Sequence, residues 1–461
     1  MKNMTIVDIA NAVSGELHIE GYESRARMCA CGVVIDSRRV DEGFVFIATV
    51  GARVDGHDYI DSVFDKGALA VICEKPPKSG KGPYILVEDS FEALKRLAAY
   101  YREQLNIPVI GITGSVGKTS TKELVASVVS KHYKTWKTQG NFNNEVGLPL
   151  TILQVDSSHE ALVVEMGINH FGEMDRLSRI ARPDIMIITN IGECHLEFLH
   201  DRDGVLKAKT ECFQNMNPEG VVILNGDDDK LLTVGKVYAA DKHYFGWSDN
   251  AEYSVAEYED KGLLGSAVSL HSKITGDTIN ADIHMPGKHM VNNALVAFAV
   301  GEALDMTAEE IREGIEDARP MAGRSNIIDT GKYVVIDDCY NANPTSMRAA
   351  LDLLNTANTR KVAIMGDMFE LGENEASLHG KVGAYASDIG IDVIITVGTL
   401  MRNAFEAVAG ADNNVQAYYF EEKQELLERI NDILENGDSI LVKASHSMGF
   451  EEVVNVLKNN S

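Results

Sequence analysis

The sequence predicts an α/β protein of three domains whose sheets are mostly parallel and covered by helices. Its 461 residues correspond to about three domains of ordinary size. From residue 109 onward, short strands that are apolar along their whole length alternate with helical segments, as in a parallel sheet buried on both faces. The same alternation of apolar strands and helical segments begins again near residue 320. We therefore expect domains at residues 1–106, 107–319 and 320–461.

The first domain is expected to start with a short helix and to end with a longer one. Between them, strands are expected at residues 31–51, 68–74 and 83–89. The longer helix is expected at residues 90–106, with Ser90 as its N-cap. The apolar face of this helix would carry Phe91, Leu94, Leu97, Ala98 and Tyr101. Pro108 disfavours a continued helix, which places the joint to the second domain at residues 106–108.

The second and third domains are expected to repeat one pattern of strands and helices. In the second domain, strands are expected at residues 109–113, 161–167, 184–192 and 220–228. Helices are expected there at residues 289–304 and 308–318, and Pro320 ends the latter. In the third domain, strands are expected at residues 333–340, 361–367, 392–398 and 439–445. Both units therefore favour a parallel sheet with helices on its faces.

The composition excludes several classes of function. The formal net charge of −26 disfavours binding to nucleic acids and to anionic membranes, although a local basic pocket is compatible with it. The sequence contains no run of about 18 apolar residues and no apolar leader, so we expect no membrane insertion. The six cysteines form neither a disulfide framework nor zinc-ligand spacing, which is typical of reduced thiols. We therefore expect a cytoplasmic protein.

A glycine-rich loop is the first candidate site. Residues 109–124 read VIGITGSVGKTSTKEL: an apolar strand, a loop, and Lys118 at the start of a helical stretch. In such a loop, backbone N–H groups and the helix dipole bind phosphate, while the lysine neutralises its charge and the Thr119 hydroxyl holds Mg²⁺. The usual spacing G-x-x-x-x-G-K-[ST] would place glycine where Ile112 stands, so a plain strand–helix turn is the alternative. The ATP-binding candidates are Thr113, Gly114, Ser115, Val116, Gly117, Lys118, Thr119 and Ser120.

Acidic, imidazole and amine side chains follow the loop at positions suited to a phosphate site. Glu165 ends an apolar strand, where a carboxylate either coordinates Mg²⁺ in the ligand crevice or only caps the strand. His195 follows the next strand and suits a metal ligand, a base or a surface histidine. Lys207 and Lys209 lie two residues apart on a predicted helix, so only one of them should point inward.

A series of motifs resembles the Mur ligases, the ATP-dependent amide-forming enzymes of peptidoglycan precursor synthesis. The loop TGSVGKTSTK resembles the family's T-G-x-x-G-K-T loop, including its departure from the usual spacing. YNANP (340–344) and MGDMFELG (365–372) resemble the branch that adds D-alanyl-D-alanine, and residues 36–60 resemble a uridine-nucleotide-binding domain. The other matching motifs are GNFNNEVGLPLT (140–151), EMG (165–167), TNIGECHLE (189–197), AKTECF (208–213), GKHMVNNALVA (287–297), GRSN (323–326) and DDCYNANPTSM (337–347).

The resemblance implies what each domain does. The first domain would bind a uridine nucleotide, the second would be a P-loop ATPase domain, and the Rossmann-like third would bind the amine substrate. ATP would activate the terminal carboxylate of UDP-N-acetylmuramoyl-tripeptide as an acyl phosphate, which the amine of D-alanyl-D-alanine then attacks. The products would be UDP-N-acetylmuramoyl-pentapeptide, ADP and phosphate. Both substrates are small molecules, and we expect a monomer that binds no nucleic acid.

The resemblance also implies roles for single residues. Lys118, His195 and Lys209 would be catalytic. Thr119 and Glu165 would bind one Mg²⁺, and His195 would bind a second together with Lys209, which is carbamylated in this family. Further implied ATP contacts are Asn293, Arg324 and Asp338. Implied substrate contacts are Ser37, Arg38, Asp55, His57, Asn141, Asn144, Tyr340, Asn341 and Asn343, although Asp55 and its neighbours also suit a plain Asp-Gly turn.

Some positions depart from the family pattern. Cys194 replaces Ala, Met290 replaces Asn, and Ala444 and His446 replace Gly and Arg. Three alternatives are a tripeptide-forming Mur ligase, a folylpolyglutamate synthase and a non-catalytic nucleotide-binding protein. Whether the tripeptide ends in lysine or diaminopimelate is open. Because the motifs lie on separate domains, we expect an open form that closes when the third domain swings onto the second.

Overall fold

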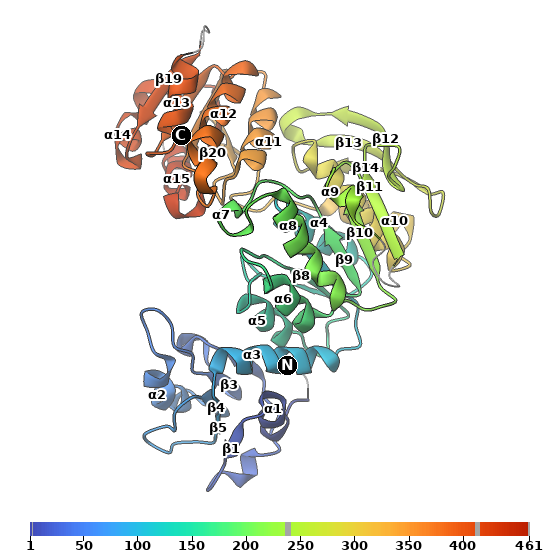
Figure 1. Cartoon of the computed structure of the whole chain (residues 1–461), viewed down its shortest axis with the longest axis vertical. Coiled ribbons are helices and arrows are strands. Elements are labelled where there is room, and N and C mark those ends of the chain that lie inside the picture. The colour runs from blue at the N-terminus through green and yellow to red at the C-terminus, as the bar shows by residue number, and fades with distance from the viewer. Residues whose placement is uncertain (2, 236–240, 411–414, 460–461) are drawn as a thin grey trace.

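Three sheets organise the chain, and each lies within one of the three expected domains (Figure 1). The computed structural model describes residues 1, 3–235, 241–410 and 415–459. Helices flank each sheet, and most strands pair in parallel, which confirms the predicted fold class. The exact domain boundaries stay a prediction. Among the described residues, no helix is both long and apolar enough to cross a bilayer.

The first domain is built on a five-stranded sheet with the order β1-β5-β4-β3-β2. Its strands are β1 (Glu16–His18), β2 (Gly32–Val34), β3 (Phe44–Ile47), β4 (Ala70–Cys73) and β5 (Tyr84–Leu86). Its helices are α1 (Ile6–Val13), α2 (Ile60–Asp65) and α3 (Ser90–Glu103), and its 3₁₀ turns are η1 (Glu23–Arg25), η2 (Ser37–Arg39) and η3 (Gly56–Tyr59). Strands β2 and β3 pair in parallel.

The start of α3 corrects a prediction. The N-cap is Asp89, whose carboxylate accepts hydrogen bonds from the backbone N–H groups of Phe91 and Glu92, and not Ser90. Ser90 is the first helical residue, and its buried hydroxyl has no partner among the described residues. The expected apolar face is buried from Leu94 to Tyr101, but Phe91 is only partly buried. Either residue type can cap a helix, so neighbouring candidates are hard to separate in sequence.

The second domain contains a nine-stranded sheet with the order β14-β13-β12-β11-β10-β9-β6-β8-β7. Its strands are β6 (Val109–Thr113), β7 (Thr135–Lys137), β8 (Ala161–Glu165), β9 (Ile185–Ile188), β10 (Val221–Asn225), β11 (Asp241–Gly246), β12 (Tyr253–Asp260), β13 (Ser266–Ser272) and β14 (Thr278–Ile283). Its helices are α4 (Lys118–Val129), α5 (Gly147–Leu153), α6 (Glu173–Ala181), α7 (Leu196–Leu199), α8 (Arg202–Thr210), α9 (His289–Ala303) and α10 (Ala308–Asp317). Its 3₁₀ turns are η4 (Glu211–Gln214), η5 (Leu231–Thr233) and η6 (Gly262–Leu264).

The central strands of this sheet are parallel and buried, as predicted. Strand β6 pairs in parallel with β8 and with β9, and all of its residues are buried. The antiparallel strands β12, β13 and β14 were not expected. Strand β14 alternates buried and exposed positions, β12 is mostly half-buried or exposed, and β13 carries polar residues among its buried ones, so each gives a weaker sequence signal than a fully apolar strand.

The third domain has a six-stranded sheet with the order β15-β16-β20-β17-β18-β19. Its strands are β15 (Asn326–Asp329), β16 (Val334–Asp337), β17 (Lys361–Gly366), β18 (Val393–Val397), β19 (Gln416–Phe420) and β20 (Ser439–Lys443). Its helices are α11 (Pro344–Asn355), α12 (Glu375–Asp388), α13 (Arg402–Ala409), α14 (Lys423–Ile433) and α15 (Glu451–Asn459), and its 3₁₀ turns are η7 (Gly372–Asn374) and η8 (His446–Met448). All its strand pairs are parallel except that of β15 with β16.

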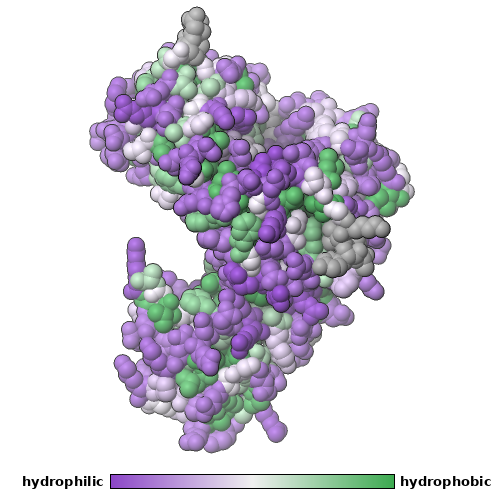
Figure 2. Space-filling model, viewed as in Figure 1, coloured by the Kyte–Doolittle hydropathy of each residue, from purple (hydrophilic) through white to green (hydrophobic). Residues whose placement is uncertain are grey.

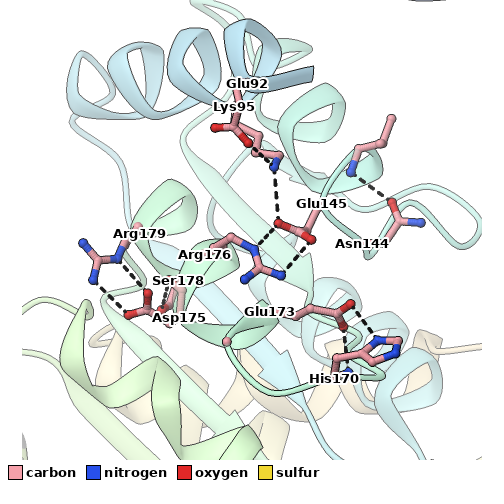
Figure 3. A network of polar contacts seen from close by, with 12 residues as sticks. Glu92, Lys95, Asn144, Glu145, His170, Glu173, Asp175, Arg176, Ser178 and Arg179 are labelled. Carbon is pink, nitrogen blue, oxygen red and sulfur yellow. Dashed lines mark hydrogen bonds and ion pairs between the residues drawn. The ribbon is translucent and has the colours of Figure 1, made fainter. Parts of the chain in front are cut away.

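Helix α3 attaches the first domain to the second. The Tyr101 hydroxyl donates to the carbonyl of Val155 at 2.6 Å, and Arg102 donates to the carbonyl of Ala181 at 2.8 Å. Figure 3 shows Glu145 between Lys95 of α3 and Arg176 of α6. One apolar cluster continues from the first domain into the second. These contacts anchor the first domain along the whole helix.

The third domain touches the second at fewer places. Turn η6 approaches α11, and Leu263 packs against the apolar core of the third domain. The segment around η7 approaches α7, where Glu370 meets His195. The space-filling view shows a notch between the first and third domains that opens to the left, with the second domain on its right (Figure 2). The second domain therefore bridges the two others.

Candidate active site

The phosphate loop joins β6 to α4, and two of its glycines have conformations that explain its spacing. Gly114 has φ +148°, and a Cβ there would lie 1.9 Å from the Thr189 hydroxyl oxygen. Gly117 has φ +84° and forms the N-cap of α4 without any side-chain hydrogen bond. Both backbone conformations favour glycine. The departure from the usual motif therefore reflects the packing of this loop against the end of β9.

Asn190, which is not among the predicted site residues, holds the loop in place. Its side-chain oxygen accepts from the Val116 N–H at 3.0 Å, and its carbonyl accepts from the Ser115 N–H at 3.0 Å. These two amides are therefore engaged within the protein. The groups left for phosphate are the N–H groups at the uncapped start of α4, where the helix dipole favours an anion. The signal that could have found Asn190 is its position as a polar residue two places after the end of the buried strand β9.

Lys118 lies over the loop that it follows. Its Nζ donates a hydrogen bond to the carbonyl of Gly114 at 2.8 Å. Burial lowers the pKa of Lys118, while the nearby carboxylate of Glu165 raises it. The side chain thus places a positive charge beside the phosphate-binding end of α4.

Thr119 and Glu165 meet at the carboxyl end of the sheet. The Thr119 hydroxyl donates to one carboxylate oxygen of Glu165 at 2.9 Å, and the Asn143 side chain donates to the other at 2.8 Å. Glu165 is only 2% exposed. A hydroxyl and a carboxylate side by side fit Mg²⁺, which usually takes one or two protein oxygens and completes its shell with phosphates and water. Within the described ranges, no group of three His, Cys, Asp or Glu side chains forms a complete metal cage.

His195 stands just before α7 and faces the same cavity. Its backbone has a left-handed φ of +52°, and its Nδ1 lies 2.7 Å from a carboxylate oxygen of Glu370 in the third domain. Burial lowers the pKa of His195, and the charges of Lys118 and Lys209 lower it further, against the opposing effect of Glu370. The imidazole is therefore held mainly neutral near pH 7, the form in which it binds metals.

Lys209 points into the protein, whereas Lys207 points to solvent. Lys209 is 1% exposed, and among the described residues its Nζ has no hydrogen-bond or ion-pair partner. Desolvation, with the charge of Lys118 adding to it, lowers the pKa of Lys209 to about 8. Lys207 is exposed and lies over the ring of Phe171. An ammonium is no metal ligand, so a second Mg²⁺ fits beside His195 only if Lys209 carries an oxygen-bearing group.

Residues at the start of the third domain close the cavity. The Arg324 guanidinium lies 3.9 Å from the centre of the Tyr340 ring. Both carboxylate oxygens of Asp338 are engaged, one by the Ser325 N–H and the other by the ammonium of Lys443. Lys443 is 3% exposed and also donates to the carbonyl of Asn341 at 2.9 Å. Lys443 was missed in sequence, although it begins the stretch KASHSMGF that differs from the family pattern.

Two predicted contact residues also have structural partners. Asn293 accepts a hydrogen bond from the Thr121 hydroxyl at 2.9 Å and donates to the sulfur of Met290 at 3.3 Å. The side-chain oxygen of Asn343 accepts from the Ser346 N–H at 2.8 Å and so caps α11. Both residues line the cavity that contains the phosphate loop. Their contacts with ATP and with the substrates stay predictions.

The predicted residues of the first domain lie away from the main cavity. Asp55 caps η3, and its carboxylate lies 2.6 Å from Nδ1 of His57. Nε2 of His57 accepts from the Glu74 N–H at 2.9 Å, so both ring nitrogens have partners in the domain. Arg38 is exposed and pairs with Asp36. Ser37 lies next to Arg38 on η2, and a role of these residues in binding a nucleotide stays a prediction.

One cavity of about 650 Å³ brings most of the predicted site together between the second and third domains. The predicted residues that line it are Ser115, Val116, Gly117, Lys118, Thr119, Ser120, Asn141, Asn144, Glu165, His195, Asn293, Arg324, Asp338, Tyr340, Asn341 and Asn343. Thr113 and Gly114 lie at the base of the loop, where the buried Thr113 hydroxyl has no partner in the part of the chain that the structure describes. A smaller cavity of about 340 Å³ joins Asn141 and Asn144 to Asp36 and Arg39 of the first domain.

The fold and this cavity define a P-loop nucleotide-binding protein of three α/β domains. Family models match along the chain: the Mur ligase family catalytic domain at residues 31–102, the Mur ligase middle domain at 112–301, and the Mur ligase glutamate ligase domain at 323–446. The chain belongs to the Mur ligase family.

Single proteins and solved structures within the family are similar to this chain along nearly its whole length. The UDP-N-acetylmuramoyl-tripeptide–D-alanyl-D-alanine ligase of Bacillus subtilis is 35% identical, with 98% of each chain covered. That of Escherichia coli is 31% identical, with 100% of this chain and 99% of the relative covered. A crystal structure of MurF from Acinetobacter baumannii superposes with a TM-score of 0.90 at 32% identity, covering 99% of this chain and 98% of that one. A Mycobacterium tuberculosis folylpolyglutamate synthase is only 16% identical and shares the fold alone.

Proposed function

We propose that this chain is an ATP-dependent ligase that joins D-alanyl-D-alanine to UDP-N-acetylmuramoyl-tripeptide, releasing ADP and phosphate. The observation that carries the proposal is the single cavity in which Lys118, Glu165 and His195 of the second domain face Arg324 and Tyr340 of the third. The relatives that cover nearly the whole chain carry the name of this ligase. The tripeptide-forming and folylpolyglutamate alternatives lack such support.

The reaction requires an activated carboxylate, because a carboxylate does not condense with an amine at neutral pH. The terminal carboxylate of the tripeptide attacks the γ-phosphorus of ATP and gives an acyl phosphate with release of ADP. The amine of D-alanyl-D-alanine then attacks the acyl carbon, and the tetrahedral intermediate collapses to the amide with loss of phosphate and a proton. Catalysis of such a sequence depends on positioning and on the stabilisation of negative charge.

The phosphate-binding end of the second domain supplies that stabilisation. Lys118 neutralises the transferring phosphoryl group, and the free N–H groups at the start of α4 bind its neighbours. Thr119 and Glu165 are the residues that would hold Mg²⁺, with Asn143 keeping the carboxylate in place. When bound there, Mg²⁺ supplies charge neutralisation to the phosphate oxygens. An ADP complex is known for the Thermotoga maritima MurF, which is 26% identical with a TM-score of 0.81.

Lys209 is proposed to react with CO₂ and to become a carbamate. Its lowered pKa leaves a substantial fraction of neutral amine near pH 8, and only the neutral amine attacks CO₂. The reaction forms an N–C bond and releases a proton, so a buried cation beside Lys118 becomes an anion attracted to it. The carbamate oxygens would then serve with His195 as ligands for a second Mg²⁺. The lack of a partner for the Lys209 ammonium within the described residues supports this assignment.

In this proposal, each of the three substrates binds to a different domain. The uridine nucleotide lies on the first domain, ATP on the second and D-alanyl-D-alanine on the third, and the small cavity beside Asn144 connects the first two. Arg324 contributes a positive charge at the domain joint. We propose a monomer that acts in the cytoplasm, where ATP is available.

The deciding experiment measures phosphate release with ATP, UDP-N-acetylmuramoyl-tripeptide and D-alanyl-D-alanine together. We expect turnover only with all three substrates, and we expect Lys118→Ala to lower it at least a hundredfold while the uridine nucleotide still binds. Running the assay with lysine- and diaminopimelate-containing tripeptides identifies the preferred third residue. Tight ATP binding without any turnover would instead support a non-catalytic nucleotide-binding protein.

A further inference from the structure

Glu370 of the third domain reaches across the domain joint to a predicted catalytic residue. Its carboxylate oxygen lies 2.7 Å from Nδ1 of His195. Glu370 belongs to the motif MGDMFELG, residues 365–372, to which the proposed reaction assigns no role. The contact therefore joins an unexplained motif to the centre of the site.

The backbone presents Glu370 on a well-held loop. Glu370 and His195 both have left-handed backbones, with φ +62° and +52°, which side-chain-bearing residues adopt only when their surroundings impose it. The Met368 N–H donates to Nε2 of His379 at 2.9 Å, and the Phe369 N–H donates to the Ser445 hydroxyl at 3.0 Å. Rigid support of this kind is what a positioning contact requires.

The contact determines which nitrogen of His195 carries the proton. A neutral imidazole has one N–H donor and one nitrogen lone pair, and the partner of one nitrogen decides the role of the other. A carboxylate only accepts hydrogen bonds, so Nδ1 is the donor and the lone pair lies on Nε2. A histidine oriented in this way by a carboxylate is a common arrangement around metal-binding imidazoles.

We propose that Glu370 is a positioning residue that holds His195 in the Nδ1–H tautomer, so that docking of the third domain completes the catalytic site. This inference rests on the proposed function for the role of His195, but the contact itself does not. The motif 365–372 then has a role, because an enzyme whose third domain has swung away has an imidazole with no fixed tautomer. Carboxyl activation would be coupled in this way to the arrival of the domain that carries the amine.

The direct test is the tautomer of His195, which needs neither turnover nor metal, measured with a non-hydrolysable ATP analogue and UDP-N-acetylmuramoyl-tripeptide present so that the third domain is docked. Long-range ¹H–¹⁵N correlation spectra of histidine-labelled protein report it, with the His195 signal assigned from a His195→Gln variant. We expect Nδ1–H in the wild type, a mixture richer in Nε2–H in Glu370→Ala, and an intermediate state in Glu370→Gln, whose amide oxygen still accepts. The matched control is Glu373→Gln, an exposed carboxylate three residues away, which should match the wild type.

Kinetics then separate positioning from simple domain attachment. In the three-substrate assay, we expect kcat to fall tenfold to a hundredfold in Glu370→Ala, with KM for ATP within about twofold of the wild type and partial rescue in Glu370→Gln. A wild-type tautomer in Glu370→Ala overturns the proposal, whatever happens to kcat. If the wild type itself shows no turnover, the proposed function fails, whereas the spectra still decide the contact. Should Glu370→Ala fold poorly, Glu370→Gln alone carries the spectroscopic test.

Discussion

Two lysines on α8 show how burial distinguishes a candidate functional residue from a neighbour of the same type. Lys207 and Lys209 are two positions apart, yet the first is exposed and the second is buried without a partner among the described residues. Burying an unpaired amine costs stability, and strongly shifted groups of this kind gather at functional sites. The sequence predicted that only one lysine would point inward, and the structure confirms Lys209 as that one.

We expect Lys209→Met to stabilise the protein while abolishing ligase activity. At pH 7 in CO₂-free buffer, the gain in the free energy of unfolding should be on the order of 3 kcal/mol, because the native pKa lies near 8 and the unfolded pKa near 10.5. The gain should shrink as the pH rises from 8 toward 10.5, where the unfolded lysine also loses its proton. Urea unfolding at pH 7 and pH 10 measures it, and Lys207→Met is the control. A less stable Lys209→Met at pH 7 would show that the folded amine has a stabilising partner.

At the scale of elements, the strand–loop–helix unit from β6 to α4 explains the unusual glycine spacing. The usual motif places its first glycine where Ile112 stands, inside a fully buried strand. Gly114 is required because the loop turns there against Thr189, and Gly117 because the helix starts from a left-handed residue. Two glycines thus meet two separate constraints.

Alanine at these two glycines should have unequal effects. We expect Gly114→Ala to weaken ADP binding at least tenfold, because its Cβ would overlap the Thr189 hydroxyl. Gly117→Ala should lower the free energy of unfolding by about 1 kcal/mol, because only its backbone conformation is unfavourable. The nearest atom that the new Cβ would meet is the side-chain oxygen of Asn293 at 3.9 Å. Calorimetry of ADP binding and thermal unfolding measure the two effects. Normal ADP binding by Gly114→Ala would contradict this account of the loop.

The helices and strands also differ in how well they could be predicted from the sequence. The fully apolar strands β6, β8 and β9 were expected, because burial on both faces leaves a continuous apolar run. Strands β12 to β14 were not expected, because exposed positions in β12 and β14 and polar residues in β13 interrupt the apolar pattern. The cap of α3 was misplaced by one residue, because Asp89 and Ser90 are equally suited and only the backbone geometry separates them.

At the scale of the whole molecule, the three domains are joined unequally. The first domain is anchored along α3 by buried hydrogen bonds and a shared apolar cluster. The third domain meets the second through a few local contacts, chiefly at Leu263 and at Glu370 with His195. The third domain is therefore the part that we expect to move.

We expect solution scattering to detect an open form that closes on binding. The radius of gyration should decrease when a non-hydrolysable ATP analogue and the UDP-N-acetylmuramoyl-tripeptide are added together. Lys118→Ala should show a smaller decrease at the same concentrations, because it holds the phosphates less well. An unchanged scattering profile in the wild type would rule out closure of this size.

The amino-acid sequence alone predicts the fold class, the order of the motifs and most of the residue types at the site. These features follow from local rules: apolar runs form buried strands, and a glycine-rich loop before a helix binds phosphate. Three contacts became visible only in the folded molecule: Asn190 engages two loop amides, Lys443 pairs with Asp338, and Glu370 reaches His195. Each of them joins residues far apart in the chain, and their distance and orientation depend on how whole sheets and domains pack.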